Sequence, residues 1–188
     1  MNEAKKSCVL CLFGVIPRSI KITWETIYNN IYLELEPFFK LDVYIFNNNI
    51  EDSEIDNIKI NNLDTNIVKE SVKNFIYEEE FQYNIDNIID NDYDQNIRYF
   101  RPNYDKKITR NAFRQLYCEK KVGDFLEKNN YDLCVVCGGD YYIAKKIDIN
   151  DIFNSLSTTD NQIIYTSQNN DACGYTNGFY FGKPRLLI

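Results

Sequence analysis

Two short, uninterrupted apolar runs constrain the fold of this chain more than any other feature of its sequence. Residues 8–13 read Cys-Val-Leu-Cys-Leu-Phe, residues 133–137 read Leu-Cys-Val-Val-Cys, and a glycine follows each run. Runs without polar alternation are typical of strands that are buried on both faces at the centre of a parallel sheet. The first run stops at Pro17-Arg18 without a small-residue cleavage site, so we interpret it as a core strand and not as a signal peptide.

Helical patterns alternate with the expected strands. Apolar residues recur with helical spacing from Ser19 to Leu35, and Pro37 ends this pattern. A second long helix is predicted at residues 108–128, with apolar residues on two faces, which requires burial on both sides or a bend near Gly123. Further strands are predicted at residues 42–46, 163–166 and 178–181. The alternation predicts an α/β fold with a mostly parallel central sheet and helices on both faces.

The charge of the chain is unevenly distributed. Its 188 residues and net charge of −7 suit a single domain over residues 1–188. Residues 47–105 contain 14 Asp and Glu but 5 Lys and Arg, whereas the rest of the chain is slightly basic. We expect this acidic, Asn-rich segment to be a solvated excursion, with a lid over a pocket as the functional alternative. The 25 asparagines fit the codon bias of an AT-rich genome, so we discount them before assigning function to any.

Several classes of function are excluded or disfavoured. The chain contains no histidine, which excludes His-based general bases, Ser-His-Asp and Cys-His nucleophile systems, and His-ligated metal sites. A pI near 4.7 argues against a nucleic-acid partner. No apolar run approaches the roughly 20 residues of a membrane span, so no span is expected.

The cysteines are interpreted as structural. Cys8 and Cys11, and likewise Cys134 and Cys137, form Cys-x-x-Cys pairs inside the apolar runs. Residues three apart on a strand point to opposite faces, so such a pair cannot easily share a metal ion. We therefore expect buried free thiols in a reducing, cytoplasmic compartment.

Ligands of open α/β sheets collect at the carboxyl ends of the strands, and three segments there carry suggestive chemistry. The first runs from Gly14 to Ser19. Ser19 is a fair helix N-cap, and backbone N–H groups beside Arg18 suit a diphosphate. The spacing matches neither GxGxxG nor a Walker A loop. An ordinary strand–helix turn with a surface arginine is the alternative.

The second segment follows the strand at residues 133–137. Gly138 and Gly139 allow a close approach to the backbone, and Asp140 comes directly after them. A lone Asp at a strand end can hold Mg²⁺ or Mn²⁺ when phosphates and waters supply the other ligands. A tight turn with a solvated Asp is the alternative.

The third segment is rich in glycine and runs from Asp171 to Gly182. This loop could present Asp171 and Asn177 to a sugar or another polyol, or it could be a Gly-rich hairpin. We expect Tyr175 either to be part of the core or to form a stacking surface. For Arg114, on the second long helix, two roles are expected as alternatives: it contacts an anionic ligand, or it pairs with a nearby Glu.

Taken in order, these segments resemble the glycosyltransferase-like proteins of large DNA viruses and some microbes, which look like reduced GT-A nucleotide-sugar transferases. The resemblance is carried by residues 13–31, 41–46, 114–117, 131–142 and 174–182, which span most of the chain outside the acidic segment. It implies a Rossmann-like GT-A sandwich with a metal-binding carboxylate at the end of a central strand. GT-A enzymes usually carry a DxD-type motif there, and this chain reads Gly138-Gly139-Asp140, which keeps only the last Asp.

The resemblance also implies a function. A sugar would pass from a UDP- or GDP-sugar to a hydroxyl of a glycan or protein acceptor, in the host cytoplasm if the protein is viral. Asp140 would hold Mn²⁺ or Mg²⁺ on the diphosphate, and Asp171 would act as the general base. Tyr175 and Asn177 would contact the sugar or the acceptor. The nucleotide would be lined by Gly14, Arg18, Ser19, Arg114, Gly138 and Gly139. A catalytically inactive binding or scaffolding protein on the same fold is the alternative, favoured by the missing DxD residues.

Overall fold

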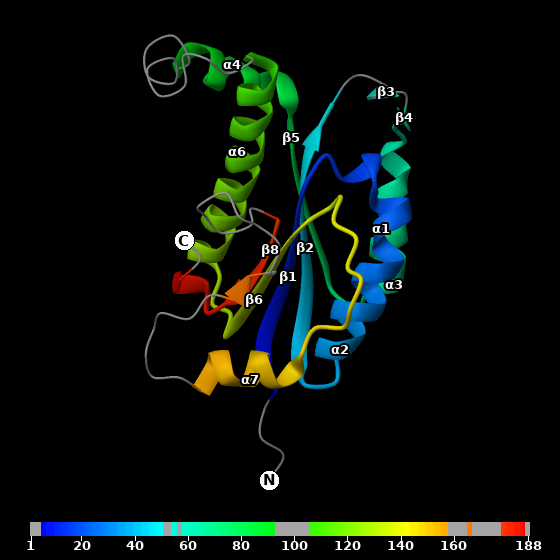
Figure 1. The fold of residues 1–188 in the computed structure, drawn as a ribbon, viewed down its shortest axis with the longest axis vertical. Coiled ribbons are helices and arrows are strands. Elements are labelled where there is room, and N and C mark those ends of the chain that lie inside the picture. The colour runs from blue at the N-terminus through cyan, green and yellow to red at the C-terminus, as the bar shows by residue number, and fades with distance from the viewer. Residues whose placement is uncertain are drawn as a thin grey trace.

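A six-stranded mixed sheet forms the centre of the computed structural model, which describes residues 5–50, 54–55, 58–92, 106–157, 165–166 and 178–186 (Figure 1). Its strands are β1 (Lys6–Gly14), β2 (Phe39–Asn49), β5 (Phe75–Phe81), β6 (Leu133–Gly138), β7 (Tyr165–Thr166) and β8 (Phe179–Gly182). They lie in the order β5-β2-β1-β6-β8-β7. The first four are parallel, and β8 runs antiparallel to both β6 and β7. The expected mostly parallel centre is therefore confirmed.

The helices cover both faces of the sheet. They are η1 (Ile16–Arg18), α1 (Ile20–Ile27), the π-helical turn η2 (Tyr28–Tyr32), α2 (Leu33–Leu35), η3 (Asn62–Thr65), α3 (Asn66–Ser71), α4 (Gln82–Asp92), α6 (Lys106–Lys128), α7 (Ile149–Ser157) and η5 (Pro184–Leu186). Figure 1 shows α1, α2 and α3 on one side of the sheet and α6 on the other. A separate two-stranded hairpin joins β3 (Glu54–Ile55) to β4 (Ile58–Lys59).

Strand β1 is buried on both faces, as its apolar run predicts. Leu10 and Leu12 pack into the core beneath α1, whereas Val9 and Phe13 pack into the core beneath α6. None of these side chains is more than 3% exposed. Because β1 pairs with β2 on one edge and β6 on the other, both of its edges are also covered.

The cysteines follow the same alternation. Cys8 and Cys137 lie in the core beneath α1, and Cys11 and Cys134 lie beneath α6, so each Cys-x-x-Cys pair is divided between the faces. All four are free thiols with no exposed surface. Burial raises the pKa of the Cys8 and Cys11 thiols well above the usual value. These thiols act as small apolar core residues.

The two apolar faces of α6 have separate partners. Cys118, Val122 and Leu126 pack onto the sheet, while Phe113 and Tyr117 pack against α4. The helix is continuous from Lys106 through Gly123 to Lys128, and the expected burial on both sides is confirmed.

The acidic segment differs from the solvated excursion that the charge pattern favoured. Its described residues supply edge strand β5 and helices α3 and α4, and Val68 and Ile85 have no exposed surface. Two interactions hold this segment on the rest of the fold. Its apolar residues are buried, and carboxylates of β5 and α4 pair with cationic side chains of α6. Strand β2 likewise extends beyond the predicted Phe46 to Asn49, because β5 pairs with its last residues.

Alanine substitution at two glycines is expected to change the free energy of unfolding in opposite directions. A Cβ on Gly178, just before β8, would lie 1.6 Å from the ring of Tyr141, whereas a Cβ on Gly123 in α6 would contact nothing within 4 Å. We predict that Gly178→Ala lowers the free energy of unfolding by about 1–3 kcal/mol through overpacking. Gly123→Ala should raise it by about 0.5–1 kcal/mol, because alanine favours the helix.

Urea unfolding of both variants measures these changes. Combining Gly178→Ala with Tyr141→Ala should recover part of the loss, because the clashing ring is removed. Equal, small effects of the two glycine substitutions would show that Tyr141 does not pack on Gly178.

Candidate functional site

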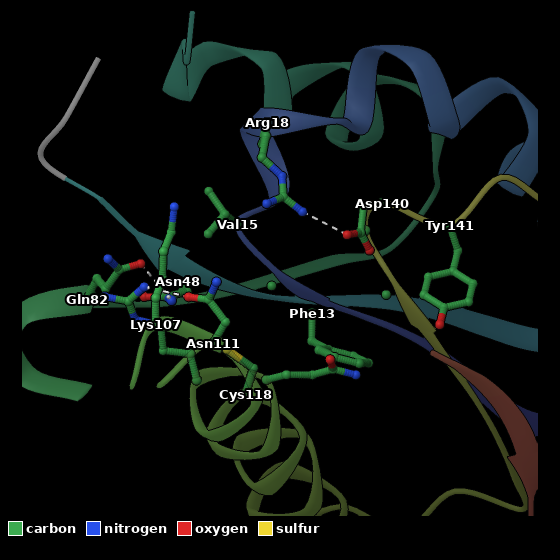
Figure 2. Close-up of a pocket in the computed structure, with 15 residues that line it drawn as sticks. Phe13, Val15, Arg18, Asn48, Gln82, Lys107, Asn111, Cys118, Asp140 and Tyr141 are labelled. Carbon is green, nitrogen blue, oxygen red and sulfur yellow. Dashed lines mark hydrogen bonds and ion pairs between the residues drawn. The ribbon is translucent and has the colours of Figure 1, made fainter. Parts of the chain in front are cut away.

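A cavity of about 550 Å³ opens at the carboxyl ends of β1 and β6, beside the first half of α6. Figure 2 shows Arg18 and Asp140 apart from a second group that contains Asn48, Gln82 and Asn111. Six of the seven described residues that the sequence assigned to nucleotide or metal line this cavity. These are Gly14, Arg18, Arg114, Gly138, Gly139 and Asp140.

The cavity lies where the direction of chain winding reverses. From β1 the chain crosses through α1 to β2 and through α3 to β5 on one side, and it then returns through α6 to β6 on the other side of β1. The connections on either side of β1 therefore diverge, which leaves a crevice at the carboxyl ends of β1 and β6. This is the usual place for a ligand in open α/β sheets.

The turn after β1 is shaped by Gly14 and by a buried amide. Gly14 has a φ of +116°, a conformation that favours glycine. The backbone N–H of Ile16 then donates to Oδ1 of Asn47 at 3.1 Å, which ties the turn to the end of β2. Together these features place Arg18 at the mouth of the cavity.

Ser19 departs from its predicted role. It precedes α1, but its side chain makes no capping hydrogen bond and it does not line the cavity. The reason is that η1 leads directly into α1, so Ser19 has φ −130° and ψ −19° instead of the extended conformation typical of a cap.

Arg18 and Asp140 form an ion pair across the cavity. Nη2 of Arg18 lies 2.7 Å from Oδ2 of Asp140, and their side chains are 33% and 49% exposed. Pairs this exposed contribute little to stability, because water screens both charges. Exchange of either partner for a charged ligand therefore costs little free energy.

The end of β6 is fixed by close packing against the turn after β1. The N–H of Gly139 donates to the carbonyl of Phe13 at 3.0 Å, and a Cβ on Gly139 would lie 2.5 Å from Cδ1 of Ile16. The close approach to Gly139 in the folded chain is thus made by Ile16, a residue of the protein itself.

Helix α1 and the π-helical turn η2 hold the chain that follows Asp140. Oγ1 of Thr23 donates to the carbonyl of Gly139 at 2.7 Å, and Oγ1 of Thr26 accepts from the N–H of Ile143 at 3.1 Å. Nδ2 of Asn30, within η2, donates to the carbonyl of Ile143 at 2.6 Å. Such π-helical turns are frequent near functional sites. These bonds on either side of Asp140 fix the backbone that carries its carboxylate.

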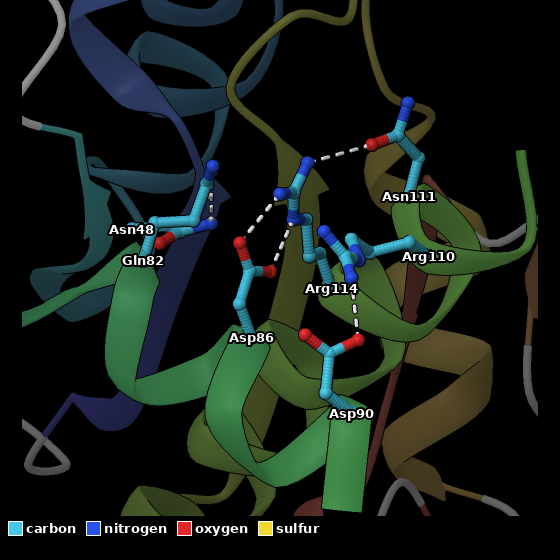
Figure 3. A network of polar contacts seen from close by, with 7 residues as sticks. All are labelled: Asn48, Gln82, Asp86, Asp90, Arg110, Asn111 and Arg114. Carbon is cyan, nitrogen blue, oxygen red and sulfur yellow. Dashed lines mark hydrogen bonds and ion pairs between the residues drawn. The ribbon is translucent and has the colours of Figure 1, made fainter. Parts of the chain in front are cut away.

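Arg114 lines the cavity and is held by α4 (Figure 3). Its Nε and Nη2 each lie 2.7 Å from one carboxylate oxygen of Asp86, and its Nη1 donates to Oδ1 of Asn111 at 2.9 Å. A bidentate pair of this kind orients the guanidinium strongly. The sequence left open whether Arg114 reaches a ligand or pairs with an acidic residue, and the structure shows an Asp in place of the expected Glu.

The lining is positively charged in a chain whose net charge is −7. Arg18, Lys107 and Arg114 line the cavity, and Asp140 is the one carboxylate among its described lining residues. Arg18 pairs with Asp140, and Arg114 pairs with Asp86, which lies outside the lining. Such a cavity suits an anionic ligand.

Sequence reasoning missed the neutral polar part of the lining. Four carboxamides line the cavity: Asn48, Gln82, Asn111 and Gln115. Asn48 was overlooked because asparagines were discounted as compositional, yet its position near the end of a parallel strand was a usable signal. Carboxamides donate and accept hydrogen bonds, so this part of the cavity suits uncharged polar groups.

The described residues do not form a metal site by themselves. No three Cys, Asp or Glu side chains within the described ranges come together as a metal-binding group. Asp140 is paired with Arg18, so a divalent cation there would need phosphate and water ligands and would take Asp140 from that pair.

The three remaining assigned residues, Asp171, Tyr175 and Asn177, lie outside the described residues. The next residue along the chain, Gly178, is described. Its carbonyl accepts from the N–H of Gly138 at 2.7 Å, at the edge of the cavity.

No protein-family model matches this chain, and no curated protein matches it in sequence. None of the helices in the described ranges is both long enough and apolar enough to cross a membrane. A functional conclusion therefore rests on the residues and geometry of the cavity.

Glu119 provides a pH-dependent contribution to stability beside the cavity. Burial raises the pKa of its carboxyl to about 7, while the bond from Gln115 opposes this effect. A raised pKa in the folded state stabilises the protein at low pH, and this contribution is lost as the pH rises through about 7. We predict that Glu119→Gln removes this loss, so the variant gains about 1–2 kcal/mol over the unsubstituted protein between pH 5 and pH 8.

Unfolding at several pH values tests this prediction. Glu127→Gln, at an exposed position on the same helix, makes the same charge change and serves as the control. Parallel pH profiles for Glu119→Gln and the unsubstituted protein would contradict a raised pKa.

Proposed function

We propose that the cavity binds the diphosphate of a nucleotide-sugar and that the protein is a glycosyltransferase of the GT-A type. The observation that carries this proposal is the positively charged cavity at the point where the winding reverses, with Arg18 at its mouth. Its volume of about 550 Å³ lies within the range of small-molecule sites. The Rossmann-like arrangement of β5, β2, β1 and β6 supports the same class.

Arg18 is the residue best placed to hold the diphosphate. It is partly exposed, lies beside the turn at Gly14, and engages Asp140 through Nη2. A guanidinium binds phosphate oxygens through several N–H donors. When the bond between the sugar and the diphosphate breaks, negative charge grows on the leaving phosphate, and Arg18 would stabilise this charge.

Asp140 is proposed to hold a divalent cation that is bound to the same diphosphate. Mg²⁺ is commonly held by one or two carboxylates together with substrate phosphates, which suits a single Asp. Mn²⁺ or Mg²⁺ there would neutralise the leaving group. In this arrangement Arg18 and Asp140 would no longer pair, because the guanidinium would bind phosphate and the carboxylate would bind the cation.

The acceptor side of the proposal rests on the resemblance. Asp171 would deprotonate the acceptor hydroxyl of a glycan or protein, with Tyr175 and Asn177 near the sugar. A carboxylate base suits a chain that has no histidine. UDP- and GDP-sugars are the proposed donors.

A nucleotide-binding protein without transferase activity is the second candidate. The observation in its favour is the Arg18–Asp140 pair, in which the one carboxylate expected to hold a metal is already occupied. Nucleotide binding without turnover of any donor would favour this second candidate.

We predict that Arg18→Gln weakens nucleoside diphosphate binding about 10- to 100-fold, the effect of losing a charge-assisted contact. Thermal unfolding with UDP, GDP and CDP measures the loss, since a ligand at 100 times its dissociation constant adds about 2.7 kcal/mol of stability. Lys120→Gln removes the same charge from the outside of α6 and should leave binding unchanged. Equal binding by both variants would contradict the role of Arg18.

Asp140→Asn is predicted to change binding in opposite directions with and without metal. Without metal, UDP or GDP should bind more tightly, because Arg18 is released and a negative charge is removed. With Mn²⁺, the variant should lose any gain in affinity that the unsubstituted protein shows, along with transfer activity. If Mn²⁺ strengthens binding equally in both proteins, the metal is not held by Asp140.

A further inference from the structure

Asn48 carries a buried hydrogen-bond acceptor that no group in the described chain satisfies. The residue is 2% exposed and lines the cavity, and its Oδ1 has no partner. Its Nδ2 is directed to Oε1 of Gln82 at 3.4 Å (Figure 3), which leaves Oδ1 as the unpaired atom of this carboxamide.

An unpaired buried acceptor is costly. Leaving such a group without a partner loses the hydrogen bonds that it makes with water in the unfolded chain. An apolar side chain of the same size would avoid this loss, so a neutral role in the core does not explain an asparagine here.

The two neighbouring asparagines on β2 have structural contacts that Asn48 lacks. Oδ1 of Asn47 accepts the N–H of Ile16 and so holds the turn after β1. Nδ2 of Asn47 also has no hydrogen-bond partner within the described ranges, but this side chain does not line the cavity. Asn49 is directed to Glu79 of β5 at 3.4 Å and lies outside the lining. Asn48 alone of the three combines a buried unpaired oxygen with a place in the cavity wall.

The position of Asn48 separates it from the charged contact of the cavity. Figure 2 shows Asn48 and its partner Gln82 away from the Arg18–Asp140 pair. If the diphosphate lies at Arg18, the uncharged part of the nucleotide can extend to the carboxamides. The group that meets Oδ1 must be a hydrogen-bond donor, which excludes phosphate oxygens and ring acceptors.

We propose that Oδ1 of Asn48 accepts a hydrogen bond from the nucleoside of the bound nucleotide and makes Asn48 a specificity residue. The donor is the ribose 2′-hydroxyl or the ring N–H of uracil or guanine. Cytosine and adenine have a ring acceptor at the corresponding position. This inference rests on the proposed nucleotide function. It adds that the nucleoside, and not the diphosphate, lies at the carboxamides.

The test compares Asn48→Leu with Asn49→Leu. Both substitutions replace a buried asparagine near the end of β2 with an apolar residue of similar size. Calorimetric titration with UDP, GDP, CDP, ADP, dUDP and dGDP measures affinity, and urea unfolding without ligand measures stability. Asn48→Leu should bind UDP or GDP about five- to tenfold more weakly, the loss of one hydrogen bond. Its unfolding midpoint should equal or exceed that of the unsubstituted protein, because an unpaired acceptor has been removed.

The nucleotides distinguish the two sources of the donor. If Asn48→Leu abolishes a preference for UDP over dUDP, the ribose hydroxyl is the group; if it abolishes a preference for UDP or GDP over CDP and ADP, the ring N–H is the group. Either result supports the proposal, provided that Asn49→Leu keeps its affinity.

Two results would overturn it. Unchanged nucleotide affinity in Asn48→Leu would remove the role of Asn48 and leave the nucleotide function standing. Failure of the unsubstituted protein to bind any of the six nucleotides, with or without Mn²⁺, would remove the nucleotide function and this inference with it.

Discussion

The parallel pairing of β1 with β2 and β6 is the constraint on which the rest of the structure depends. Phe13 lies opposite both Phe46 and Gly138, so β1 and β6 end within one residue of each other, while β2 continues to Asn49. The strand is buried on both faces and paired on both edges, which fixes the turn that follows it. Strand pairing therefore brings Arg18 and Asp140, 122 residues apart in sequence, within 2.7 Å of each other. Their mutual attraction is not needed to fold the chain.

The net charge of the acidic segment does not indicate where its carboxylates lie in the folded chain. Its carboxylates meet cations of α6 as discrete pairs, Asp86 with Arg114 and Asp90 with Arg110. Each pair contributes little on its own, but together they accompany the burial of Ile85 against α6. The same pairing orients Arg114, so the position of a cationic residue in the cavity depends on a segment that its composition marks as solvated.

Much of the fold could be predicted because a few local patterns determine it. The apolar runs identify β1 and β6, and the rule for strand ends brings Gly14, Arg18 and Asp140 together. The length of β2 could not be predicted, since three polar residues after Phe46 end the apolar pattern and only pairing with β5 extends the strand. Asn48 was missed for the same reason: its burial comes from tertiary contacts, and its residue type is common throughout the chain.

The cavity combines two kinds of incomplete interaction. At one end, opposite charges satisfy each other in an exposed pair that a ligand can exchange at little cost. At the other, a neutral acceptor is buried without a partner among the described residues, so a ligand that donates to it displaces no existing bond there. A ligand that gains free energy at both ends must carry negative charge and an uncharged donor, separated along its length. A nucleoside diphosphate has this arrangement, whereas inorganic phosphate or a free sugar has only half of it. Charge at Arg18 would then supply affinity for many phosphorylated molecules, and Asn48 would restrict which of them fit.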